Sequence, residues 1–155
     1  MTHNEEVIDL LRTAYMMELE TVENYLANSV HLDGIHAETI KASLARDVAE
    51  EFSHASRLAK RIKELGGRVP GSLELERSQN TLQPPESSTD VDAVIAGVIE
   101  AEQMAIDHYR QLIRATDDED YVTQEMAISI LAEEESHLVL FEGFRAGCQH
   151  EASHR

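Results

Sequence analysis

Two copies of a short pattern of acid and histidine stand 83 positions apart in the chain. In the first copy Glu51 is followed three residues later by His54, and in the second Glu134 is followed by His137. Residues three apart on a helix are neighbours on one face, so each copy places a carboxylate beside an imidazole. These are ligand types that bind divalent transition metals. Each copy is therefore predicted to supply part of a metal site.

The duplication continues upstream of both patterns. Glu18 stands 33 positions before the first pattern, and Glu102 stands 32 positions before the second. Each of these acids is followed seven residues later by a tyrosine, Tyr25 or Tyr109. Seven residues are two helical turns, so acid and tyrosine share nearly the same face. The chain is thus predicted to be a duplicated helical hairpin whose copies each carry half of a metal centre. The candidate ligands, which are also the candidate catalytic residues, are Glu18, Glu51, His54, Glu102, Glu134 and His137.

Burial of these acids favours a metal centre over a purely structural cluster. They lie within apolar stripes of the predicted helices, and four buried carboxylates are prohibitively costly unless cations compensate them. Iron or manganese suits four Glu and two His better than zinc or magnesium does. Two alternatives stay open. Each histidine can be a core residue bonded to the glutamate of its own turn, and Tyr25 and Tyr109 can be packed tyrosines rather than hydrogen-bond partners of the ligands.

Four helical segments and one long connection are predicted to position these residues. The segments span about residues 4–31, 36–65 and 90–115, and from the acidic turn at 116–120 to about Phe144, with Asn4 as the first N-cap. Short turns join the first two segments and the last two, which indicates two antiparallel hairpins. The fold class is therefore all-α, an antiparallel four-helix bundle.

Residues 66–88 contain all three prolines and show no helical periodicity. A helix of about 30 residues spans roughly 45 Å, and about 20 extended residues reach further than that. This segment is therefore predicted to cross over along the bundle between the second and third helices, with Leu73, Leu75 and Leu82 packed against it. The bundle domain is expected to span residues 1–146, followed by a short, polar and mobile tail at 147–155.

Helical geometry also separates the acids of the first helix. Glu18 follows the apolar stripe, whereas Glu20 and Glu23 are rotated away from it by about 200° and 140°. Both are therefore expected to face solvent or a neighbouring subunit. Apolar residues outside the stripe predict at least a dimer through the first two helices, because contiguous apolar surface usually marks an interface. These residues are Tyr15, Met16, Met17 and Leu19.

Composition narrows the class of protein. A chain of 155 residues is the size of one domain, and its net charge of −17 argues against nucleic-acid binding. No stretch approaches the roughly 20 apolar residues of a membrane span, and no signal peptide is recognisable at the start. The single cysteine, Cys148, allows no internal disulfide. We expect a cytoplasmic protein without membrane partners.

Over residues 1–146 the chain resembles the ferritin-like di-iron carboxylate superfamily, most closely bacterioferritin and Dps-like proteins with a bacterioferritin-type site. The segment 17–25 is similar to the first-helix motif of that family, and both Glu-x-x-His patterns match in place. The resemblance implies that Glu18 and His54 hold one iron and that Glu102 and His137 hold the other. It further implies that Glu51 and Glu134 bridge the two ions.

Two departures from bacterioferritin modify what the resemblance implies. Phe52 stands where bacterioferritin has its haem-ligating methionine, so no haem is expected. No fifth helix is expected after Gly147, which makes a shell of about twelve subunits more compatible with this chain than one of twenty-four.

The resemblance implies a ferroxidase, which oxidises Fe(II) to Fe(III) with dioxygen or hydrogen peroxide in iron detoxification, iron storage and protection from oxidative stress. The expected cofactors are two iron ions, with manganese as an alternative, in a homo-oligomer. A di-metal peroxidase of the rubrerythrin or manganese-catalase type is the alternative function, since ferroxidases and these enzymes share the same ligands. A metal-free helical interaction module is the third.

Overall fold

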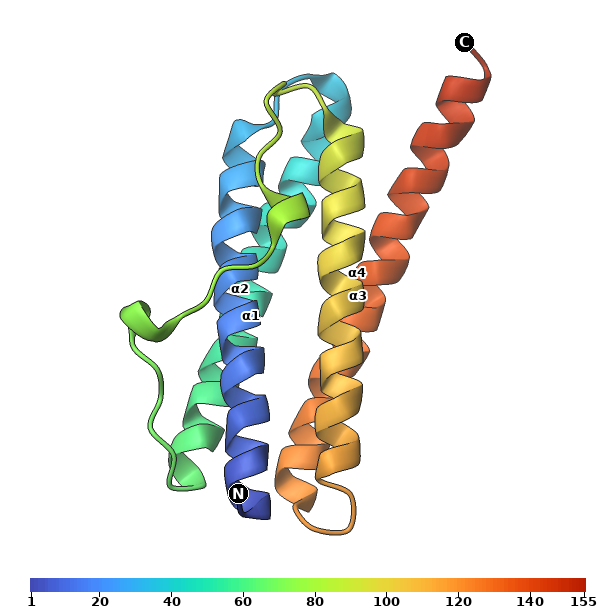
Figure 1. Cartoon of the computed structure of the whole chain (residues 1–155). Helices are drawn as coiled ribbons and strands as arrows, with labels where there is room; N and C mark the ends of the chain where they lie inside the picture. Colours follow the sequence, from blue (N-terminus) through green and yellow to red (C-terminus); the bar gives the residue numbers. More distant parts are fainter.

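Four long helices form the molecule in the computed structural model, which describes residues 1–155 (Figure 1). The helices are α1 (His3–His31), α2 (Glu38–Glu64), α3 (Val91–Ala115) and α4 (Tyr121–Ser153). Packing of α1 on α2 and of α3 on α4 gives two antiparallel hairpins, and α1 against α3 joins them. The predicted all-α bundle is confirmed. None of the helices combines the length and the apolar composition that a membrane span requires.

The core consists of two apolar clusters that lie toward opposite ends of the bundle. One includes Leu32, Leu44 and Phe141, and the other includes Leu11 and Ile62. Along every helix the predicted ligands fall between the residues of the two clusters. The polar centre therefore sits at mid-height, with apolar packing above and below it that excludes water and holds the helices in register.

The first helix begins at His3, one residue earlier than predicted, and its N-cap lies two residues earlier than predicted. Thr2 is its N-cap and forms a capping box with Glu5, in which the Thr2 hydroxyl accepts from the Glu5 N–H and the Glu5 carboxylate accepts from the Thr2 N–H. The prediction of Asn4 as the N-cap was therefore wrong. Its side chain instead donates to the carbonyl of Leu65 at the end of α2, at 3.2 Å.

The fourth helix ends nine residues later than predicted. It continues through the expected tail to Ser153, and Figure 1 shows its last turns leaving the other three helices. No proline interrupts this stretch, and a single glycine such as Gly147 costs a helix only about 1 kcal/mol. Cys148 packs partly against the neighbouring apolar cluster. The prediction that this helix ends at about Phe144 was therefore wrong.

The long connection runs along the bundle, as expected for a crossover between α2 and α3 (Figure 1). Two short 3-10 turns, Ser72–Glu74 and Asn80–Leu82, interrupt it. Leu82 is buried as predicted and Leu75 is half-buried, but Leu73 is fully exposed. At Gly97 of α3 the crossover comes so close that a Cβ would lie 2.3 Å from the carbonyl oxygen of Thr81. Only glycine fits there without displacing the crossover.

The expected outward position of Glu20 was also wrong. Glu20 is 4% exposed, because the crossover covers this face of α1. Its carboxylate accepts backbone N–H groups from Ser78 and Gln79, each at 2.9 Å. Glu20 therefore anchors the crossover, since these N–H groups would otherwise be left without partners. Glu23 stays at the surface and pairs with Arg77.

Candidate metal centre

All six predicted ligands converge at mid-height of the bundle. Glu18 comes from α1, Glu102 from α3, and each Glu-x-x-His pair from α2 or α4. Every one of these side chains is buried, and the most exposed of them, His137, is only 6% exposed. Their burial follows from the helical spacing that defined them, because each acid replaces an apolar residue in the inward stripe of its helix.

The six residues form two overlapping groups of four. Within each group, every residue offers one ligand atom that lies within 4.8 Å of those of the other three. The first group is Glu18, Glu51, His54 and Glu134, and the second is Glu51, Glu102, Glu134 and His137. Two carboxylates, those of Glu51 and Glu134, belong to both groups. Only these two acids are therefore placed to contact two ions at once.

The inward nitrogen of each histidine faces three carboxylates. His54 Nδ1 lies 3.0 Å from Glu134 Oε1 and 3.4 Å from Glu51 Oε2. His137 Nδ1 lies 3.1 Å from Glu51 Oε1 and 3.6 Å from Glu134 Oε2. The third carboxylate is Glu18 for His54, at 3.6 Å, and Glu102 for His137, at 3.5 Å. The arrangement is nearly two-fold symmetric, as the duplicated sequence predicts.

Several atoms of this cluster have no hydrogen-bond partner although they are fully buried. They are both oxygens of Glu51, one oxygen each of Glu102 and Glu134, and Nδ1 of both histidines. Buried polar atoms in folded proteins almost always have a partner, so a group of orphaned atoms that face each other requires an explanation. A pair of cations fits it, because carboxylate oxygens and imidazole nitrogens are a donor set that iron and manganese accept. The residues present therefore fit a di-metal centre.

Mutual repulsion shapes the charges of the cluster in the absence of a cation. Burial and then the charge of Glu18 raise the pKa of Glu51 and of Glu134 well above the usual range. Burial acts in the same direction on Glu18, but contact with Glu51 and His54 outweighs it and lowers this pKa to about 2. Burial acts to lower the pKa of both histidines, but the surrounding carboxylates raise both values. In the metal-free protein, protons on these glutamates and histidines therefore reduce the repulsion among the four buried carboxylates.

A ring of outer contacts orients the ligands, and each contact crosses from one hairpin to the other. Tyr25 donates to Glu102, and Tyr109 donates to Glu18. Of the two alternatives left open for these tyrosines, the structure shows hydrogen-bond partners of the ligands. Burial and then the charge of the glutamate partner raise the pKa of each hydroxyl well above its usual range, so both tyrosines keep the proton that they donate.

The outer nitrogens of the two histidines have partners that sequence reasoning missed. His54 Nε2 contacts Glu133, and His137 Nε2 lies 2.9 Å from Glu50. These contacts turn Nδ1 of each ring toward the centre and fix its tautomer. The signal was present in the sequence, because the duplication extends one residue upstream of each pattern. Glu50 and Glu133 occupy matching positions in the two halves.

The crossover closes a small cavity that reaches the carboxylates. The cavity measures about 10 Å³, the space of a single water molecule, and lies between α1 and α3. Gln79 covers it from outside, donating to the Thr21 hydroxyl at 2.7 Å and accepting from the Asn24 amide at 2.9 Å. The small side chains of Ala101 and Ala105 on α3 line this cavity and leave space for it.

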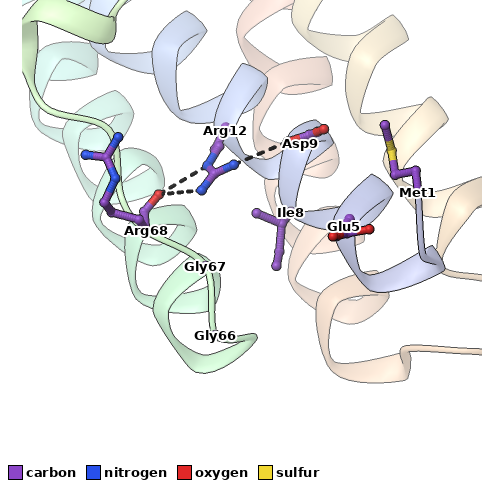
Figure 2. A pocket seen from close by; sticks show the side chains of 8 residues that line it. All are labelled: Met1, Glu5, Ile8, Asp9, Arg12, Gly66, Gly67 and Arg68. Carbon is purple, nitrogen blue, oxygen red and sulfur yellow. Dashed lines mark hydrogen bonds and ion pairs between the residues drawn. The ribbon is translucent and has the colours of Figure 1, made fainter.

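A larger hollow of about 540 Å³ lies at the end of the bundle, between the start of α1 and the end of α2 (Figure 2). Arg12 crosses it and donates to the carbonyl oxygen of Arg68 at 3.0 and 3.1 Å, and to Asp9 at 3.3 Å. The guanidinium is already engaged within the protein, and none of the six candidate ligands lines this hollow. This hollow is therefore separate from the candidate metal centre.

Comparison with known proteins agrees with this geometry. A family model described as a ferritin-like domain matches residues 8–147. The chain is 29% identical over 147 residues to the DNA protection during starvation protein of Pyrococcus furiosus, covering 92% of this chain and 78% of that one. It is 28% identical over 138 residues to the bacterioferritin of Desulfovibrio desulfuricans, covering 88% of this chain and 73% of that one.

Solved structures share the fold. A dodecameric thioferritin, the bacterioferritin-related protein of Bacteroides fragilis, superposes with a TM-score of 0.87 at 25% identity, over 97% of this chain and 90% of that one. The D. desulfuricans bacterioferritin, whose structure shows a diiron site, superposes with a TM-score of 0.78 at 24% identity, over 96% and 82% of the two chains. With the family match spanning nearly the whole bundle, this chain belongs to the ferritin-like domain family.

Proposed function

We propose that this protein is a ferroxidase that oxidises Fe(II) to Fe(III) at the six-residue centre and so serves iron detoxification and storage. The observation that carries the proposal is the inward set of partnerless oxygen and nitrogen atoms, which two cations would satisfy. Glu18 and His54 would hold one ion and Glu102 and His137 the other. Glu51 and Glu134 stand in both groups and would bridge them. Iron supplies the one-electron redox chemistry when bound.

The overall reaction balances with either oxidant. Two Fe(II) give two electrons to dioxygen, which with two protons becomes hydrogen peroxide, or to hydrogen peroxide, which with two protons becomes two water molecules. The chain's own contribution is position and charge. Tyr25 and Tyr109 keep Glu102 and Glu18 oriented, and the carboxylates favour the more positive Fe(III). Removal of Fe(II) from peroxide-containing surroundings is the protective consequence.

Anaerobic addition of Fe(II) to metal-free protein, followed by dioxygen or hydrogen peroxide, tests this function. Wild-type protein is expected to oxidise two Fe(II) per chain in a fast first phase, monitored by ferric absorbance, because the centre has two overlapping groups of ligands. Sustained decomposition of peroxide by the manganese-loaded protein, with no Fe(II) oxidation, would instead support an enzyme of the manganese-catalase type and contradict the proposal.

We also propose that the chain works as a homo-oligomer, a dimer at least and a shell of about twelve in the storage form. Phe52 on α2 is 58% exposed and Leu26 on α1 is 54% exposed, so the first hairpin carries apolar side chains on its outer face. Tyr15, Met16 and Leu19 on α1 are half-buried in the single chain. The structural relative from B. fragilis is a dodecamer, which supports a shell of about twelve subunits.

Light scattering coupled to size-exclusion chromatography measures the assembly. A mass near twelve times 17.4 kDa is expected for the shell, and Phe52→Glu is expected to shift it toward smaller species, because a charge would then be buried at the interface. Leu73→Glu, at a fully exposed position of the crossover, is the matched control. A monomeric wild type at micromolar concentration would exclude a storage shell and leave the redox chemistry of the centre possible.

A further inference from the structure

The end of α4 carries a pair of histidines that the six-residue centre does not use. His150 lies in the last turn of the helix and His154 is its C-cap. Both side chains are exposed. Residues four apart are neighbours on one face of a helix. The two imidazoles therefore face the same region of solvent, where the last turns of α4 have left the other three helices (Figure 1).

The two imidazole rings already lie against each other. The centres of the His150 and His154 rings are 4.3 Å apart, and their planes are tilted by 44°. Zn(II) binds an imidazole nitrogen at about 2.0–2.1 Å, so one ion can contact both rings with little movement of either. Two histidines at this spacing on one helix face are also the arrangement with which a helix supplies two zinc ligands. The pair has the geometry of a bidentate chelate.

The chain also fixes the tautomer of His154. Nδ1 of this ring lies 3.0 Å from the carbonyl oxygen of His150 and 3.1 Å from the hydroxyl of Ser153. Because a carbonyl oxygen only accepts, Nδ1 carries the proton and the lone pair of Nε2 is left free. Metal-binding histidines commonly donate their other ring N–H to a backbone carbonyl in this way. His154 is therefore held in the form that binds a cation through Nε2.

The electrostatic surroundings of the pair favour a cation. The exposed side chains of Glu151 and Arg155 lie beside the two histidines, and their opposite charges offset one another. The end of the helix then determines the sign, because the last carbonyl groups of α4 give it a partial negative charge. The net charge of the chain, −17, acts in the same direction.

We propose that His150 and His154 bind one divalent transition cation, Zn(II) being the metal that best suits two imidazole nitrogens completed by water. The donors distinguish this site from the six-residue centre, in which four carboxylates accompany two histidines. The site lies at the end of α4 and is open to solvent. Its occupation does not depend on the oxidation of iron.

Zinc binding to metal-free full-length protein, measured by isothermal titration calorimetry at neutral pH, tests the site. Wild-type protein is expected to bind one more Zn(II) per chain than His150→Ala or His154→Ala. Any zinc in the six-residue centre is common to all three proteins and cancels in the comparison. Loss of either imidazole is expected to weaken the additional site at least about 10-fold. His36→Ala, at an exposed histidine before α2, is the matched control and is expected to keep the additional zinc.

The outcomes separate this site from the proposed ferroxidase centre. Equal zinc counts in the wild type and the two variants would overturn the proposal, and so would loss of the additional zinc in His36→Ala. Glu51→Gln is expected to disturb the six-residue centre and to keep the additional zinc, so the two sites can fail independently. Both histidines are exposed, so neither alanine variant is expected to change the helical content measured by circular dichroism.

Discussion

Glu51→Ala is expected to remove both cations of the six-residue centre and to slow Fe(II) oxidation by at least about 100-fold, since even partners outside the ligand set change metal affinity or activity 10- to 100-fold. The reason is geometric, because Glu51 belongs to both groups of four and both of its oxygens face the centre. Stoichiometry from metal analysis and rates from stopped-flow absorbance measure the two effects.

Two further variants on α3 show whether the assignment of shared and single ligands is right. Glu102→Gln is expected to lose one cation, because Glu102 belongs to one group of four only. Glu100→Gln, two residues away on the solvent face of the same helix, is expected to lose none. A Glu51→Ala protein that retains as many cations as Glu102→Gln would contradict the bridging position of Glu51. Glu20 is unsuitable as a control because it anchors the crossover.

The metal-free protein is expected to lose stability as the pH rises from about 5 to 8. Glu51, Glu134, His54 and His137 all have pKa values in the folded state above their ordinary values of 4.5 and 6.5. The folded chain therefore binds more protons than the unfolded chain above pH 4.5, and stability falls as those protons leave. Below pH 4.5 the sign reverses, because the pKa of Glu18 is lowered to about 2. Maximum stability is expected near pH 5.

Cations replace those protons, so metal binding is expected to raise the melting temperature more at pH 8 than at pH 5. Two cations, each at about 100 times its Kd, stabilise the fold by roughly 2.7 kcal/mol apiece. With about 2–4 °C per kcal/mol for a chain of this size, the rise is on the order of 10–20 °C. Calorimetry with chelator and with Mn(II) at a series of pH values measures both trends. A melting temperature of the metal-free protein that climbs between pH 5 and 8 would contradict the cluster of raised pKa values.

The centre was predictable from the sequence because its geometry is local to each helix. A carboxylate and an imidazole three residues apart must share a face, and the repeat of that pattern with an upstream acid specifies four inward stripes. Helix number, pairing and the six converging residues follow from these intervals. The inward position of the two tyrosines follows in the same way, because each stands two helical turns after an inward acid.

The errors concern contacts that no helical interval encodes. Glu20 was placed outward because rotation about one helix says nothing about a non-repetitive segment lying over it. Glu50 and Glu133 were missed although the repeat places them at matching positions, because their partners are on the opposite hairpin. The end of α4 was misplaced because polar composition was taken as a sign of disorder.

The exchange of outer contacts between the hairpins has a consequence for folding. Each tyrosine and each outer histidine nitrogen finds its glutamate on the other hairpin. Neither hairpin can satisfy its own buried polar groups, so neither has a stable state of its own with these side chains buried. We therefore expect the chain to be a single cooperative unit that melts in one transition despite its internal repeat. Opening of either hairpin exposes the polar groups of both.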